Sequence, residues 1–275
     1  MFALSALALS AVGADSTGVE GFRFPPLTPG RSTGAGVMAK RTIADLKLDL
    51  IWVDPGTFVM GSPPEEPERH PSEGPPVTVT LTQGFWLGKT EVTQAQYEAI
   101  AGINPSHFKE AGQDAPVDEV SWIEAAAYCE KLTERERAAG RLPEGYAYML
   151  PTEAQWEYAY RAGTTGFYPG SPDAMAWTAE NSGATTHPVA QRQANAWGFF
   201  DMGGNILEWC ADWFGDYPRG AVTDPKGPSS GSFRMARGGS WRMAARVTRS
   251  AARAGGSAGR HDYTLGFRLA LCAVK

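Results

Sequence analysis

Side chains able to act as soft metal ligands or nucleophiles are few in this chain of 275 residues. The cysteines and histidines are Cys129, Cys210, Cys272, His70, His107, His187 and His261. The histidines show no H-x-x-x-H or similar spacing, so the sequence does not indicate a histidine-ligated iron site. Each cysteine lies in a segment predicted to belong to the core, which favours three small buried side chains over reactive thiols. An odd and small number of cysteines also excludes a disulfide framework.

Arginine is concentrated at the C-terminal end of the chain. Residues 231–275 hold eight arginines and one lysine against one acid, Asp262, whereas the whole chain has a formal charge of −5. This asymmetry is compatible with an anionic partner. The alternative, favoured because the arginines are spaced through a patterned segment, is that they pair with acids elsewhere in the fold. Nucleic acid is not an expected partner, because the chain is acidic and has no reading-helix motif.

The composition predicts a folded, loop-rich domain that positions these side chains. Hydrophobic residues make up 43% and charged residues 20%, which is typical of globular rather than disordered chains. The 32 glycines and 20 prolines favour short elements joined by loops. The length suits one large domain, which we place at residues 47–275 after a loosely packed arm at residues 1–46. A lone domain predicts a monomer.

The first 14 residues are apolar and end in small residues, as a secretory signal does. No basic residue precedes Arg23, however, so the positive region of such a signal is missing. The segment is also too short to span a bilayer, and no membrane span is expected. The sequence therefore leaves a cytoplasmic and an exported location both open.

Short strands and three capped helices account for the regular structure that we expect. Strands are predicted at 77–81, 85–88, 205–213, 233–241 and 266–272, and at 50–53 and 57–61 as a hairpin around Asp54-Pro55-Gly56. Helices are predicted at 94–101, 121–137 and 152–163, with Thr93, Ser121 and Thr152 as caps.

The third predicted helix has the composition of a scaffold element. Trp156 and Ala159 share one face and would pack together. Glu153 and Glu157 lie four residues apart and are placed to meet backbone donors or arginines. We therefore interpret this helix as structural rather than catalytic.

Seven motifs, taken in order, resemble those of one protein family. They are VDPGTFVMGS at 53–62, KTEVTQAQY at 89–97, PVDEVSW at 116–122, LPTEAQWEYA at 150–159, NAWGFFDMGGNILEW at 195–209, RGGSW at 237–241 and GFRLA at 266–270. Together they resemble the formylglycine-generating enzyme, or sulfatase-modifying factor, domain. This resemblance implies an α+β fold of the C-type-lectin-like type, irregular and loop-rich, with two or three helices.

The resemblance does not extend to the catalytic cysteines of that family. Its enzymes bind copper with a Cys pair shortly after the Gly-Gly-Ser-Tyr/Trp segment, because thiolates are soft ligands that hold Cu(I). Here RMAARVTR at 242–249 follows Trp241, and no cysteine occurs between Cys210 and Cys272. We therefore expect neither bound copper nor formylglycine generation. Composition leaves a Ser-His-Asp arrangement open, although no nucleophile-elbow motif occurs.

The resemblance also implies a calcium loop at residues 201–208. By position, Asp201 and Glu208 would donate carboxylate oxygens, and Gly204 and Ile206 would donate backbone carbonyls. Such a donor set suits a hard cation, whose role would be structural. The alternative is a calcium-free turn in which the two acids accept hydrogen bonds, and the sequence leaves both interpretations open.

The segment 237–270 resembles, in addition, the variable region of proteins diversified by retroelements. Its frame is formed by RGGSW, three spaced arginines and GFRLA, and the positions between follow no periodicity. The candidate ligand-binding residues are Trp241, Arg242, Met243, Ala244, Val247, Thr248, Ala252, Ala254, Gly255, Gly256, Ser257, Gly259, Arg260, Asp262, Tyr263 and Thr264. The resemblance implies that such positions lie on the lectin-fold surface and bind ligands, with the arginines as struts. Sequence drift in an exposed loop would also produce positions without periodicity.

We therefore predict a non-catalytic binding protein that presents residues 241–264 to a protein or small-molecule ligand. Two alternatives remain open. One is a metal-dependent oxidase or other enzyme of the same superfamily, and the other is a domain that modulates a partner enzyme.

Overall fold

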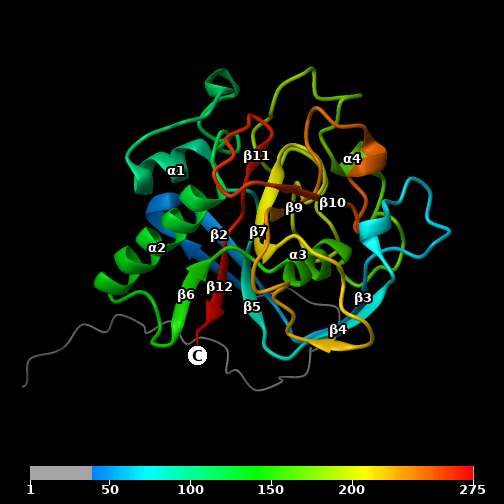
Figure 1. Ribbon diagram of the computed structural model, residues 1–275. Helices are drawn as coiled ribbons and strands as arrows, with labels where there is room; N and C mark the ends of the chain where they lie inside the picture. Colours follow the sequence, from blue (N-terminus) through cyan, green and yellow to red (C-terminus); the bar gives the residue numbers. More distant parts are fainter. Residues whose placement is uncertain (1–38, 275) are drawn as a thin grey trace, which may run out of the picture.

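The computed structural model describes residues 39–274 (Figure 1). The signal-like segment at 1–14 lies outside the described residues, as does most of the predicted arm. No helix within residues 39–274 is both long enough and apolar enough to cross a membrane.

The two ends of the described chain meet in one antiparallel sheet of five strands. Its order is β1 (Lys40–Ile43), β2 (Leu48–Val53), β5 (Phe85–Gly88), β12 (Ala270–Ala273) and β6 (Tyr146–Met149). Strand β1 precedes Lys47, and Lys40 lies opposite Ile51 of β2. The folded domain therefore begins earlier than the boundary that we placed at residue 47.

Two smaller sheets complete the strand structure. The four-stranded sheet has the order β10 (Arg253–Gly256), β9 (Arg234–Arg237), β7 (Leu207–Trp213) and β11 (Leu265–Gly266). The three-stranded sheet has the order β3 (Gly56–Met60), β4 (Val77–Leu81) and β8 (Val222–Thr223). Figure 1 shows β3 and β4 at one side of the molecule, away from α1 and α2.

The predicted hairpin at 50–61 is wrong. β2 pairs with β1 on one edge and with β5 on the other, so no edge of β2 is left for β3. β3 pairs instead with β4, and the turn at Asp54-Pro55 carries the chain from one sheet to another. The predicted strand at 233–241 also ends early, because Gly238 and Gly239 turn the chain with φ of 96° and 75°.

Three helices begin where the sequence predicts, namely α1 (Gln94–Ala101), α2 (Trp122–Ala138) and α3 (Glu153–Arg161). The short helix α4 (Pro172–Met175) was not predicted. Thr93, Ser121 and Thr152 each form a complete capping box at the start of α1, α2 and α3. Single 3-10 turns occur at Ala44–Leu46, Pro71–Glu73, Lys109–Ala111 and Ala245–Val247.

Large aromatic side chains fill the interior between these elements. Trp86, Trp156 and Trp209 are fully buried, and Ala159 is buried beside Trp156 as predicted. All three cysteines are buried and unpaired, which confirms their interpretation as small apolar side chains. The structure is thus the irregular, loop-rich α+β fold that the sequence predicts.

Candidate functional site

Buried arginines of the C-terminal segment pair with acids from distant parts of the chain. The pairs are Arg237–Glu157, Arg249–Glu66, Arg249–Glu73, Arg253–Glu153 and Arg268–Glu208. This confirms the interpretation that these arginines bridge to acids elsewhere in the fold. We refer to Arg237, Arg249, Arg253 and Arg268 as the frame arginines.

Helix α3 receives two of these pairs. Arg253 donates from Nε to Glu153 Oε1 at 2.6 Å and from Nη2 to Glu153 Oε2 at 2.8 Å. Arg237 is fully buried and pairs with Glu157, which also accepts from Arg161 Nε at 2.9 Å. Both acids of α3 therefore meet arginines, as predicted. A buried charge left without its partner is costly, so these pairs hold β9 and β10 in place against α3.

Three of the four frame arginines line a pocket of about 490 Å³ in the predicted ligand-binding segment. Five of the predicted residues line it, namely Met243, Ala244, Val247, Ala252 and Ala254. Arg237, Arg249 and Arg253 also line it, and so do Glu73, Leu207 and the pair Gly238–Gly239. We refer to this hollow as the segment pocket. Its charged walls are already neutralised by ion pairs, whereas its apolar lining carries no such partners.

A second group of predicted residues forms an aromatic cluster. The Trp241 and Tyr263 rings lie 5.9 Å apart, and Phe108 contacts both, with ring centroids 5.1 Å from Trp241 and 6.1 Å from Tyr263. The Arg242 guanidinium lies 5.6 Å from the Tyr263 ring centroid. Arg242 is exposed and Tyr263 is half-buried, whereas Trp241 is buried and donates from Nε1 to the Tyr263 carbonyl at 3.2 Å.

The other predicted residues divide between the surface and the interior. Gly255, Ser257, Gly259 and Arg260 are exposed, and Asp262 is half-buried. Thr248, Gly256 and Thr264 are buried. Thr248 Oγ1 donates to the Ala245 carbonyl at 2.8 Å, and Thr264 Oγ1 donates to Asp262 at 2.6 Å. The two threonine side chains hold the segment in shape, and none of these three buried residues forms its outer surface.

One wall of the segment pocket comes from the loop at residues 62–76, for which the sequence predicts no function. Glu68, His70 and Glu73 line the pocket, and Glu66 lies behind them on Arg249. His70 Nδ1 accepts from the Ser72 backbone N–H and caps the turn that holds Glu73. Residues 62–76 are rich in acids and the C-terminal segment is rich in arginine. This difference in composition is the signal that could have predicted ion pairs between them.

The predicted calcium loop has few free donors. Both oxygens of Glu208 accept from Arg268, at 2.6 Å each, and Oε2 also accepts from Trp156 Nε1 at 2.8 Å. Asp201 Oδ2 accepts from the Ala190 backbone N–H at 2.7 Å. Its Oδ1 is the one carboxylate oxygen of this pair without a hydrogen-bond partner among residues 39–274.

This arrangement does not fit the implied calcium donor set. The Arg268 guanidinium occupies the carboxylate of Glu208 and would repel a cation there. In residues 39–274 no group of three or more histidines, cysteines or acids is arranged to hold a metal ion. Gly204 and Ile206 are buried on the approach to β7. The contacts of Asp201 and Glu208 agree with the alternative of a hydrogen-bonded turn.

The cysteines have the chemistry of core residues. Burial raises the pKa of Cys272 to about 11 and raises the pKa of Cys129 and Cys210 further above the usual thiol range. Thiols with raised pKa values stay protonated at neutral pH and are poor metal ligands. None of the three lines the segment pocket.

Comparison with known proteins places this fold in one family. The family model described as "Sulfatase-modifying factor enzyme 1-like domain" matches residues 36–273, and the chain belongs to that family. The chain is 31% identical to "Chaperone protein LppX" of Paenibacillus barcinonensis over 247 residues, covering 73% of this chain and 80% of that protein. It is 30% identical to the formylglycine-generating enzyme of Streptomyces coelicolor over 246 residues, covering 82% of this chain and 66% of that enzyme.

A solved structure extends the comparison. "Treponema denticola variable protein 1" superposes with a TM-score of 0.75 at 30% sequence identity, covering 86% of this chain and 99% of that chain. The similarity therefore includes enzymes and a variable protein on one scaffold.

Proposed function

We propose that this protein is a non-catalytic binding protein whose segment pocket, with the exposed residues beside it, forms the ligand-binding surface. The observation that carries the proposal is the convergence of Met243, Ala244, Val247 and Ala254 on one pocket braced by buried ion pairs. Similarity to a variable protein over nearly its whole length supports this function.

The segment separates residues that hold the backbone from residues that are free to differ. Arg237, Arg249 and Arg253 are each tied to an acid from another part of the chain. Met243 and Val247 are half-buried, and no side-chain hydrogen bond holds them among residues 39–274. Side chains of the second kind can be replaced without leaving a buried polar group unpaired. A binding surface whose residues vary while its backbone stays fixed requires this separation between the two kinds of residue.

Copper-dependent formylglycine generation does not agree with the site. Met243 supplies the sulfur atom of the segment pocket, and one thioether does not replace two thiolates. The family also contains enzymes, so oxidation or other chemistry at this pocket is the competing function. It would require a bound metal and a loss of turnover when a residue lining the pocket is changed.

A pair of display libraries tests the proposal. In the first, Met243, Ala244, Val247 and Ala254 are randomised in the full chain, and variants are selected on immobilised hen egg lysozyme. In the matched second library, the exposed residues Ile123, Glu130, Lys131 and Glu134 of α2 are randomised. We expect most clones of both libraries to fold, and binders to emerge from the first library only. A concave site surrounds a partner, which the convex helix face of the control does not.

Two results would contradict the proposal. One is a first library in which most clones are unfolded, because the segment would then be structural. The other is an equal yield of binders from both libraries. Diversification has its own test in the genome, where an Asn-rich near-copy of this segment and a reverse-transcriptase gene should lie close to the gene.

A further inference from the structure

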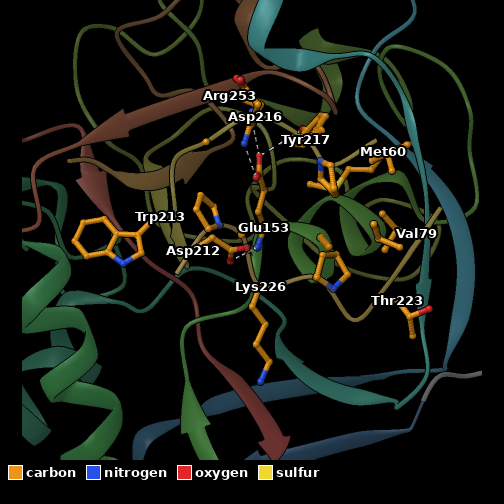
Figure 2. A pocket seen from close by; sticks show the side chains of 18 residues that line it. Met60, Val79, Glu153, Asp212, Trp213, Asp216, Tyr217, Thr223, Lys226 and Arg253 are labelled. Atoms are coloured by element: carbon orange, nitrogen blue, oxygen red, sulfur yellow. Dashed lines mark hydrogen bonds and ion pairs between the residues drawn. The ribbon is translucent and has the colours of Figure 1, made fainter. Parts of the chain in front are cut away.

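A second cavity, of about 450 Å³, lies between the three-stranded sheet and the start of α3 (Figure 2). Its walls come from β3, β4 and β8, from the loop at residues 214–221 and 224–228, and from Arg253. We refer to it as the sheet cavity. Its volume lies within the range of pockets that take small organic molecules, roughly 300–1,000 Å³. Arg253 lines both this cavity and the segment pocket, but the other lining residues differ.

One side of the sheet cavity is apolar. Met60, Val77 and Val79 of the sheet contribute to it, and Val222 on the short edge strand β8 extends it. Met60 and Val79 are 4% and 0% exposed, whereas Val222 is half-buried and presents more accessible surface. This wall favours a ligand with a hydrocarbon body.

The opposite side holds a buried acid without a counter-ion. Asp212 is 4% exposed, and its Oδ2 accepts from the Glu153 backbone N–H at 2.8 Å. Its own backbone N–H also donates to the carboxylate, and no basic side chain among residues 39–274 forms an ion pair with it. Figure 2 shows the Lys226 side chain extending away from Asp212. A buried carboxylate in this state lacks the compensation that buried charges require.

The other charged groups around Asp212 supply only part of that compensation. Arg253 is engaged by Glu153 and by the Ser72 carbonyl at 2.7 Å. Arg234 donates to the Ala211 carbonyl at 2.9 Å and lies between two tryptophan rings. Glu153 adds negative charge, and Asp216 at the exposed rim adds more. Burial, reinforced by Glu153, raises the pKa of Asp212 to about 7.

We propose that the sheet cavity binds a small amphiphilic amine, with its ammonium group on the Asp212 carboxylate and its hydrocarbon body against the apolar wall of Met60, Val79 and Val222. The ammonium supplies the missing counter-ion and a charge-assisted hydrogen bond. An anionic ligand is disfavoured, because the donors of Arg253 are already used and Asp212 would repel it. This site shares only Arg253 with the segment pocket, and the proposal does not rest on the function proposed for that pocket.

Three probes of one length test the proposal on the full chain. n-Octylammonium, n-octanol and n-octanoate share a hydrocarbon body and differ in charge. Calorimetry at pH 8 should give the tightest binding for octylammonium, weaker binding for octanol and the weakest for octanoate. At pH 5.5 Asp212 is largely protonated, so the affinity for octylammonium should fall several-fold while that for octanol changes little.

Variants separate the two halves of the site. Asp212→Asn should lower the affinity for octylammonium to that for octanol, whereas Asp173→Asn, which removes the same charge from an exposed position on α4, should not. Val222→Phe narrows the cavity from its half-buried edge and should weaken all three probes. If Asp212→Asn fails to fold, the pH dependence and Val222→Phe decide.

The proposal is overturned if octanol binds the wild-type chain as tightly as octylammonium does, or if octanoate binds most tightly. It is overturned equally if Val222→Phe leaves binding unchanged. Neither result bears on the proposed function of the segment pocket, because its libraries randomise residues that do not line the sheet cavity.

Discussion

Arg249 and Glu73 lie 176 residues apart in the chain and form a two-pronged ion pair, with Nη1 2.7 Å from Oε2 and Nη2 2.8 Å from Oε1. Arg249 also donates to Glu66 Oε1 at 2.6 Å. The pair ties the predicted binding segment to the loop at 62–76. Both side chains are buried, so the segment pocket depends on this contact for its shape.

We predict that Arg249→Met lowers the free energy of unfolding by about 3–5 kcal/mol, because it leaves two buried carboxylates without a cation. Urea denaturation monitored by tryptophan fluorescence measures this change. The matched control is Arg246→Ala, whose pair with Glu68 is 3.5 Å long and mostly exposed on both sides. Its loss should cost less than about 1 kcal/mol. Equal costs for the two variants would show that the frame does not depend on Arg249.

The pairing of Glu208 with Arg268 leads to a prediction about calcium. Because Arg268 occupies Glu208, any calcium affinity at residues 201–208 should be weak. With a dissociation constant above 1 mM, calcium at 1 mM stabilises by less than about 0.4 kcal/mol, which shifts Tm by roughly 1–2 °C. Thermal unfolding in EGTA and in calcium measures the shift. A saturable rise in Tm of many degrees would instead support the calcium loop that the resemblance implies.

Asp118 predicts a pH dependence of stability. It is buried, and burial raises its pKa from 3.8 to about 6, although the backbone N–H groups of His107 and Phe108 donate to it. Because the folded pKa lies above the unfolded value, the stabilisation from protonation is full below about pH 4. It is lost as the pH rises through 6. Asp118 holds the turn that places Phe108 against Trp241, so the effect bears on the aromatic cluster.

The variant Asp118→Asn should lack this dependence. Between pH 4 and pH 7 the wild-type chain should lose about 2.4 kcal/mol of stability relative to the variant. Urea denaturation across that range measures the difference, with the exposed Asp114→Asn as a control that should follow the wild type. A difference that stays constant or rises with pH would contradict the prediction.

The buried thiols predict slow chemical modification. With 5,5′-dithiobis(2-nitrobenzoate), the native chain should react at least on the order of 100-fold more slowly than the unfolded chain, where all three cysteines react. Cys272 is 9% exposed and should react first. Rapid native labelling of Cys129 or Cys210 would show that a reactive thiol had been mistaken for a core residue.

Elements with local signals could be predicted from the sequence. The capping boxes at Thr93, Ser121 and Thr152 involve residues three apart, so the starts of three helices could be predicted without knowledge of the fold. The burial of the cysteines and the arginine-to-acid bridging also followed from residue type and spacing. The family could be identified from seven motifs and from their order along the chain.

Tertiary structure alone decided which residues meet. The predicted hairpin does not form because both edges of β2 pair with other strands, β1 and β5. The local pattern of residues 50–61 does not indicate this pairing. The loop at 62–76 became a wall of the segment pocket only through Arg249, and Thr248 and Thr264 turned inward although the pattern placed them with surface residues. Asp212 is a candidate ligand-binding residue only because it lines a cavity that three separate sheet strands help to form. Local hydrogen bonds are fixed by spacing along the chain, whereas ion pairs and cavities are fixed by the path of the chain through space.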